Sequence, residues 1–380
     1  MATTAPYPES QGQALVERPR WGRRLLLTST IVAFMAFLAW SVAVRQALLF
    51  VVGVGMGSVL AGARFGFTTA WRNFIEQRDP SGVLAQLLLL ALAAIICIPL
   101  LAAYPVALRA ALGPPSISLL LGAFVFGACM QIADGCGSGT LYKAGLGIPL
   151  NTVVLPLFAV GSFLGSATLE QWLALGAMPP YGLVTNLGAP AALSLTLIGL
   201  ALLAVWAVRS ADVAARLLNR KLLVGAVLLA LLAVLNLVIA GQPWGVVYGF
   251  GLWAAKLATA TGLFDPAANA FWSEPANATT LQQSLFLDVT SITNIGILAG
   301  ALWIAVGKRR PAKKSMTKTQ WIVVIVAGFL LGYSSRLAFG CNIGAMVSGI
   351  STGSLHGWIW VVMAFLGSLL GLRIRRRFAL

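Results

Sequence analysis

The sequence contains very little charge for its length. Only 9% of the 380 residues are charged and 59% are hydrophobic, whereas a soluble domain carries about 25% charged residues. No polar stretch is long enough for a separate soluble domain, and no zinc-ligand spacing, Walker loop or Ser-His-Asp arrangement is present. These absences argue against a soluble enzyme. The mean hydropathy of +0.89 indicates an all-α polytopic membrane protein instead.

Acidic residues are much scarcer than basic residues, and the net charge is +16. The basic residues cluster in short segments at 18–24, 209–221, 308–318 and 373–377, a distribution typical of cytoplasmic loops and ends. The loops 169–189 and 263–284 contain no Lys or Arg, so they are expected on the opposite side. We therefore predict that both termini are cytoplasmic, that the bilayer is the surrounding partner, and that nucleic acid is not bound.

Hydrophobic segments divide the chain into two halves. The apolar runs lie near 25–45, 47–65, 84–108, 116–133, 151–168, 190–208, 221–240, 245–262, 285–307, 320–338 and 357–374. The basic segments all fall on the cytoplasmic side if the short, glycine-punctuated run 245–262 is re-entrant. This leaves ten crossings. The glycine-rich stretch 53–67 is a second candidate for a broken helix. The predicted organisation is a disordered tail (1–24), a first membrane half (25–208), a basic linker (209–221) and a second membrane half (222–380).

A shift of 205 residues superimposes two parts of the sequence. Cys136 then falls on Cys341, and five further identities are Phe124 with Phe329, Gly127 with Gly332, Ala133 with Ala338, Gly135 with Gly340, and Gly139 with Gly344. The predicted topology directs the run before Cys136 inwards and the run before Cys341 outwards. The copies are therefore expected to form an inverted repeat with broken helices near the membrane midplane, as in many transporters.

Each copy is an apolar run that ends at Gly-Cys inside the membrane. Glycine lets the chain turn, and the short segment that follows begins with unpaired backbone N–H groups, which favour an anion. Two inverted copies would bring Cys136 and Cys341 towards each other on a central axis. The predicted site is Cys136, Cys341, Gly135, Gly137, Ser138, Gly139, Thr140, Gly340, Asn342, Gly344 and Arg336, with Gly66, Arg64, Lys143, Lys256 and Asp134 as weaker candidates.

The stretches GACMQIADGCGSGTLYKAG and GYSSRLAFGCNIGAMVSG resemble the two Gly-Cys signatures of the YeeE/YedE family of sulfur transporters. The resemblance implies an hourglass-shaped protein that takes up thiosulfate across the bacterial inner membrane along re-entrant loops bearing cysteines. It also implies a cytoplasmic sulfurtransferase as a possible recipient. Members tend to carry an early cysteine in an R-x-x-F-C type motif, whereas this chain reads ARFGFTTAWR, with Gly66 in that place.

Other interpretations stay open at the level of sequence. Cys136 and Cys341 could cycle through a disulfide in a membrane redox protein, fill space in two structural turns, or line a small-solute channel. Cys129 and Met130 could form a soft-metal relay for copper, which we regard as the weaker hypothesis because the second copy lacks equivalent ligands. Lys143 and Lys256 could extend to an interface. We expect no enzyme activity, cofactor or metal; the substrate, energy source and oligomeric state are left undetermined.

Overall fold

The computed structural model describes residues 21–212, 219–306 and 316–380. All the named elements in these ranges are helices. Those of the first half are α1 (Trp21–Ser41), α2 (Val44–Ala63), α3 (Phe67–Gln77), α4 (Ser81–Ala103), α5 (Ile117–Ile132), α6 (Gly137–Gly145), α7 (Pro149–Ala167), α8 (Leu169–Leu173), α9 (Leu183–Leu187) and α10 (Ala189–Arg209). The second half contains α11 (Arg220–Ala240), α12 (Val247–Ala260), η1 (Pro266–Ala268), α13 (Ala270–Ser273), α14 (Pro275–Gln282), η2 (Leu285–Leu287), α15 (Val289–Ala305), α16 (Lys318–Leu337), η3 (Asn342–Gly349) and α17 (Leu355–Arg377).

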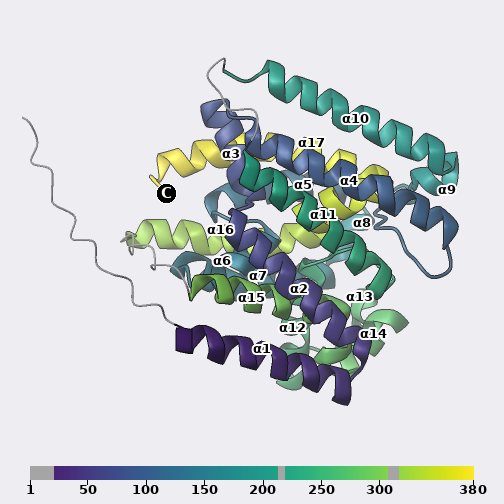
Figure 1. Cartoon of the computed structure of the whole chain (residues 1–380), viewed down its shortest axis with the longest axis vertical. Helices are drawn as coiled ribbons and strands as arrows, with labels where there is room; N and C mark the ends of the chain where they lie inside the picture. Colours follow the sequence, from purple (N-terminus) through teal and green to yellow (C-terminus); the bar gives the residue numbers. More distant parts are fainter. Residues whose placement is uncertain (1–20, 213–218, 307–315) are drawn as a thin grey trace, which may run out of the picture.

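The long helices share one general direction, as a membrane bundle requires (Figure 1). Among the described residues, nine segments are long and apolar enough to cross a bilayer, and α15 is a shorter apolar helix of 17 residues. This confirms the predicted polytopic all-α fold. Helix α12 has 14 residues and is about 21 Å long, too short for a hydrocarbon layer of about 30 Å. Its length therefore supports the re-entrant interpretation of 245–262.

The basic helix ends lie together on one face of the bundle. Figure 1 places the start of α1 and the ends of α10 and α17 on the left, with α8, α9, α13 and α14 near the right. Both halves thus begin and end on the same side of the fold. The predicted tail falls largely in 1–20, and parts of the basic segments fall in 213–218 and 307–315; these stretches lie outside the described residues.

The glycine-rich stretch 53–67 is broken, as we expected, but only near its end. Helix α2 is continuous through Gly53 and Gly57 and ends at Ala63; the chain then turns at the left-handed Arg64 (φ 51°) before α3 begins at Phe67. The two glycines allow α15 to approach. A Cβ at Gly53 would lie 2.4 Å from Thr293 O, and one at Gly57 would lie 2.1 Å from Ile297 O. They serve helix packing, as small residues commonly do between membrane helices.

Two further helix pairs pack through glycine, and they are equivalent. A Cβ at Gly127 of α5 would lie 2.0 Å from Ala364 O of α17, and one at Gly332 of α16 would lie 2.1 Å from Phe158 O of α7. The offset that relates Gly127 to Gly332 also relates Phe158 to Ala364 to within one residue. The two halves thus share the Gly-Cys motif and also the glycine contact that packs the helix before it.

The equivalent helices α5 and α16 begin on opposite faces of the bundle. Ser116, which caps α5, pairs with Ala177 on the face of α8 and α9. Gln320, in the first turn of α16, donates a hydrogen bond to Phe378 O at the other face. A repeat whose copies run in opposite directions is inverted, as the sequence predicted.

We expect Gly332→Ala to destabilise the fold by about 1–3 kcal/mol, because the methyl group would press on the Phe158 carbonyl of α7. The matched control is Gly62→Ala in α2, where an added Cβ would meet only the tip of Ile304 at 3.9 Å. Thermal unfolding of the detergent-solubilised protein measures both changes. Equal stability of the two variants would contradict the close-contact role of Gly332.

Candidate functional site

Both halves make the same turn after the central helix. Helix α5 ends at Ile132 and α16 ends at Leu337, and each is followed by a residue with left-handed backbone, Asp134 (φ 52°) or Phe339 (φ 56°). The next residue is glycine in both cases. Gly340 has φ 150°, and a Cβ there would lie 2.5 Å from Ala345 N, so only glycine fits.

The turns place each cysteine at the start of a short helix. Cys136 precedes α6, and its Sγ accepts a hydrogen bond from Gly139 N at 3.4 Å. Cys341 precedes η3, and its Sγ accepts from Ile343 N, also at 3.4 Å. Both side chains are fully buried, and both thiols are free. The predicted pairing of cysteine with a helix N-terminus is therefore present in both copies.

The two turns are in contact. A Cβ built on Gly137 would lie only 2.9 Å from Cys341 Sγ and 3.3 Å from Cys341 Cβ. A side chain at Gly137 would fill the place next to the second thiol. The N-terminal ends of α6 and η3 therefore meet at one buried point, from opposite directions, with a thiol on each side.

Several buried polar groups around this point have no hydrogen-bond partner among the described residues. They include both side-chain polar atoms of Asn342, both of Asn151, and the hydroxyl of Thr140. Asn151 and Thr140 lie beside the first turn, since a Cβ at Gly135 would be 3.1 Å from Asn151 Nδ2 and 2.8 Å from Thr140 Oγ1. Leaving a buried amide unpaired costs about 1–3 kcal/mol, so these groups are suited to a polar ligand or water.

The first turn of the short helix α12 packs beside the meeting point of the two turns. Val247 Cγ1 would lie 3.1 Å from a Cβ on Gly137. The backbone here is fixed by Ser162 Oγ, which donates to Val247 O at 2.9 Å, and by Asn294 Nδ2, which donates to Val246 O at 2.9 Å. The start of α12 is thus buried within protein, the condition under which a helix can begin at membrane depth.

The charges near the two turns differ between the halves. Asp134 accepts from Arg72 at 2.7 Å and from Lys143 at 2.8 Å, so one carboxylate joins α3 and α6. Arg336 donates to Ser166 Oγ at 2.8 Å and lies over the rings of Tyr248 (5.6 Å) and Phe271 (5.3 Å). It has no carboxylate partner in the described part of the chain.

The remaining predicted residues are spread more widely. Ser138 lies beside Cys136, with its Oγ 3.6 Å from Sγ, while Gly344 in η3 has open space at its Cβ position. Gly66 caps α3, after the left-handed Arg64. Lys256 donates instead to Leu281 O and Gln283 O, so it anchors the segment after α14 rather than the thiols.

Sequence reasoning missed three residues that the fold brings to this region. Arg72 was part of the quoted stretch ARFGFTTAWR, and its charge within a mostly apolar chain was an available signal. Asn151, a polar residue in an apolar run, was another. Val247 carried no signal, because its place beside Gly137 is set by the tertiary packing of α12.

Comparisons with known proteins show the family of the chain. A family described as "Sulphur transport" matches residues 62–370. The chain belongs to this family. It is 25% identical over 342 residues to "Thiosulfate transporter TsuA" of Spirochaeta thermophila, covering 83% of this chain and 95% of that protein. It is also 36% identical over 78 residues to "Probable transporter YedE" of Escherichia coli, but that match spans only 20% of this chain and 19% of YedE.

Membership gives the protein its general role. It is a multi-span membrane protein of a sulfur-transport family. The Salmonella typhimurium "Probable transporter YedE" matches over the same short length, at 35% identity across 78 residues. The chain therefore corresponds to about a fifth of each YedE relative and to nearly the full length of TsuA.

We expect Asp134→Ala to lower the free energy of unfolding by about 2 kcal/mol, because it leaves the partly buried Arg72 and Lys143 without their shared partner. The matched control is Glu76→Ala. That residue pairs with Arg376, which is 62% exposed, so its loss should cost less than about 1 kcal/mol. Chemical unfolding in detergent compares them. A loss at Glu76 as large as that at Asp134 would contradict this ranking.

Proposed function

We propose that the protein takes up thiosulfate, or a closely related sulfur oxyanion, through the point where the two Gly-Cys turns meet. The observation that carries the proposal is the contact between the turns. It brings two free, buried thiols and two helix N-termini to one buried point. A sulfur anion suits both kinds of group, since its oxygens can accept backbone N–H donors while its terminal sulfur lies against a thiol.

The binding groups are individually weak, which is what passage requires. A thiol is a poor hydrogen-bond donor, and a helix N-terminus carries only a partial positive charge. An anion held by Cys341, Asn342 and then Cys136 would be released at each step, because several weak sites in series conduct better than one strong site. Asn151 and Thr140 supply further polar contacts on the side of the first turn.

Charge beyond the turns would guide the anion. Arg336 lies at the end of α16 with no carboxylate partner in the described residues, so it can attract a dianion towards Cys341. On the other side, Arg72 and Lys143 are both engaged by Asp134. The anion would therefore leave Cys136 past a pair of cations whose charge is already partly balanced.

The direction proposed is inward across a bacterial inner membrane, with both termini cytoplasmic. Moving a dianion inwards against 100 mV costs about 4–5 kcal/mol, so an ion gradient or consumption of the product must drive it. A cytoplasmic sulfurtransferase would provide that consumption. The early cysteine of the family is replaced by Gly66, so the pathway proposed here uses two thiols rather than three.

We predict that Cys136→Ala and Cys341→Ala each reduce thiosulfate uptake at least tenfold, because each removes one of the two adjoining sites. Uptake of labelled thiosulfate by cells that express equal amounts of each variant measures this. The matched controls are Cys97→Ala and Cys129→Ala, which remove buried thiols in the helices α4 and α5 and should leave uptake close to that of the wild type.

Undiminished uptake in both Cys136 and Cys341 variants would overturn the thiol pathway. Two further outcomes point to other functions. Oxidant-dependent loss of both thiols together, without an effect of thiosulfate, would indicate redox exchange. Full activity of Cys→Ser variants with neutral solutes would indicate a channel.

A further inference from the structure

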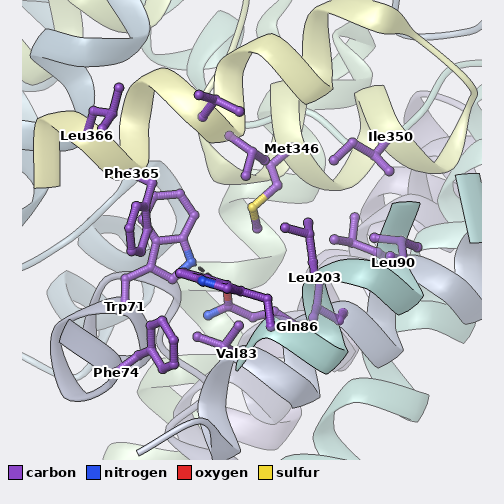
Figure 2. Close-up of a pocket in the computed structure, with 15 residues that line it drawn as sticks. Trp71, Phe74, Val83, Gln86, Leu90, Leu203, Met346, Ile350, Phe365 and Leu366 are labelled. Atoms are coloured by element: carbon purple, nitrogen blue, oxygen red, sulfur yellow. Dashed lines mark hydrogen bonds between the residues drawn. The ribbon is translucent and has the colours of Figure 1, made fainter. Parts of the chain in front are cut away.

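A crevice opens between helix α10 and the rest of the bundle. It has a volume of about 240 Å³, and side chains of α3, α4, α10, η3 and α17 line it (Figure 2). Trp71 and Phe74 form one wall, and Met346 of η3 and Ile350, the residue after it, form another. The segment that follows Cys341 therefore lines part of this crevice.

The crevice presents hydrocarbon to any occupant. Gln86 is the one polar side chain among its lining residues, and both ends of its amide are engaged. Gln86 Oε1 accepts from Trp71 Nε1 at 3.0 Å, and Gln86 Nε2 donates to Phe67 O at 3.3 Å. Because the amide of Gln86 is engaged and the other lining side chains are aliphatic, aromatic or thioether, an apolar chain is the suitable occupant.

The rim of the crevice faces outwards from the bundle. Val362 is 58% exposed, Leu366 46% and Trp206 44%, although all three belong to long apolar helices. In a membrane these surfaces meet lipid rather than water. A gap beside them would lose dispersion contacts unless a lipid tail entered it.

Three arginines follow the crevice at one end. Arg78 lies four residues after Phe74, Arg209 lies three after Trp206, and Arg373 lies seven after Leu366, so each is one or two helical turns beyond the lining. All three are exposed, and their side chains make no hydrogen bond or ion pair within the described residues.

The ends that carry these arginines lie together. The ring centroid of Trp206 lies 5.0 Å from that of Phe74 and 5.7 Å from that of Phe365. These contacts join α10 to α3 and α17. Glu76 of α3 also pairs with Arg376 of α17 at 2.9 Å. In Figure 1 the last turns of α10 and α17 are on the left, the face of the basic chain ends.

We propose that this crevice is a binding site for an anionic phospholipid. One acyl chain enters between α10 and α17 and packs against Met346 and Ile350, while Arg78, Arg209 and Arg373 hold the headgroup phosphate. Basic side chains at a membrane surface attract anionic lipid, and an apolar slot directly above them fixes the tail. The site is separate from the thiols, but it contacts η3, the segment that Cys341 begins.

The test measures lipid bound to the purified full chain. The protein in mild detergent is equilibrated with phosphatidylglycerol or with phosphatidylcholine of identical acyl chains, and native mass spectrometry counts the bound lipid. We expect at least tenfold tighter binding of phosphatidylglycerol. Each arginine should contribute about fivefold, so replacing Arg78, Arg209 and Arg373 with Gln should lower its affinity on the order of a hundredfold.

A matched control separates the site from general surface charge. Arg23→Gln removes an exposed arginine at the start of α1, which lies at the opposite edge of the bundle from α10, and should leave binding unchanged (Figure 1). A loss as large in Arg23→Gln as in any one of the three single variants would overturn the proposal, as would equal binding of the two lipids by the wild type.

The tail is tested by filling the crevice. Leu203→Trp should reduce binding of both lipids at least tenfold, whereas Leu203→Met, which conserves volume, should not. Val362→Trp fills the crevice from its exposed rim, where the folded state tolerates change, and should act in the same way. Wild-type lipid binding by folded Val362→Trp protein would show that the acyl chain lies elsewhere.

Discussion

Close contact between glycine-bearing helices is the constraint on which the rest of this structure depends. A chain can turn inside a membrane only where neighbouring protein covers its backbone, because lipid offers no hydrogen bonds. Gly127 and Gly332 bring α5 onto α17 and α16 onto α7 until backbone meets backbone. That spacing leaves room for two short helices to begin inside the bundle. The thiols Cys136 and Cys341 are therefore a consequence of helix packing as much as of local sequence.

The inverted repeat fixes the geometry of the site, and departures from it give the site direction. The left-handed position that follows the central helix is Asp134 in one copy and Phe339 in the other. Where the first copy has Gln131, the second has Arg336, at the same offset of 205 residues. One side of the meeting point thus carries a balanced charge cluster and the other an arginine without a carboxylate partner in the described residues. The two copies of one repeat can in this way present different charges to an anion on the two sides of the meeting point.

Much of this arrangement could be predicted from sequence because its signals are local. A Gly-Cys pair that ends an apolar run specifies a turn and a helix start, and repetition at a fixed offset specifies the partner. Glycines alone did not locate the break: the stretch 53–67 is interrupted only after Ala63, whereas Gly53 and Gly57 lie within α2 and allow α15 to pack closely. The role of Val247 could not be predicted, since its side chain reaches the turns only through the tertiary packing of α12, which Ser162 helps to hold. The partners of Lys256, Leu281 O and Gln283 O, could not be predicted for the same reason, because the fold of the α14 segment sets them.

The central claim is that a sulfur anion passes between the two cysteine turns. The most direct measurement is the rate at which a small thiol reagent modifies Cys136 and Cys341 in a chain that lacks Cys97 and Cys129, in membranes, with and without thiosulfate. The account predicts that thiosulfate slows modification of both thiols, whereas sulfate, a dianion without a terminal sulfur, protects them much less. Modification rates that thiosulfate leaves unchanged at both positions would contradict it.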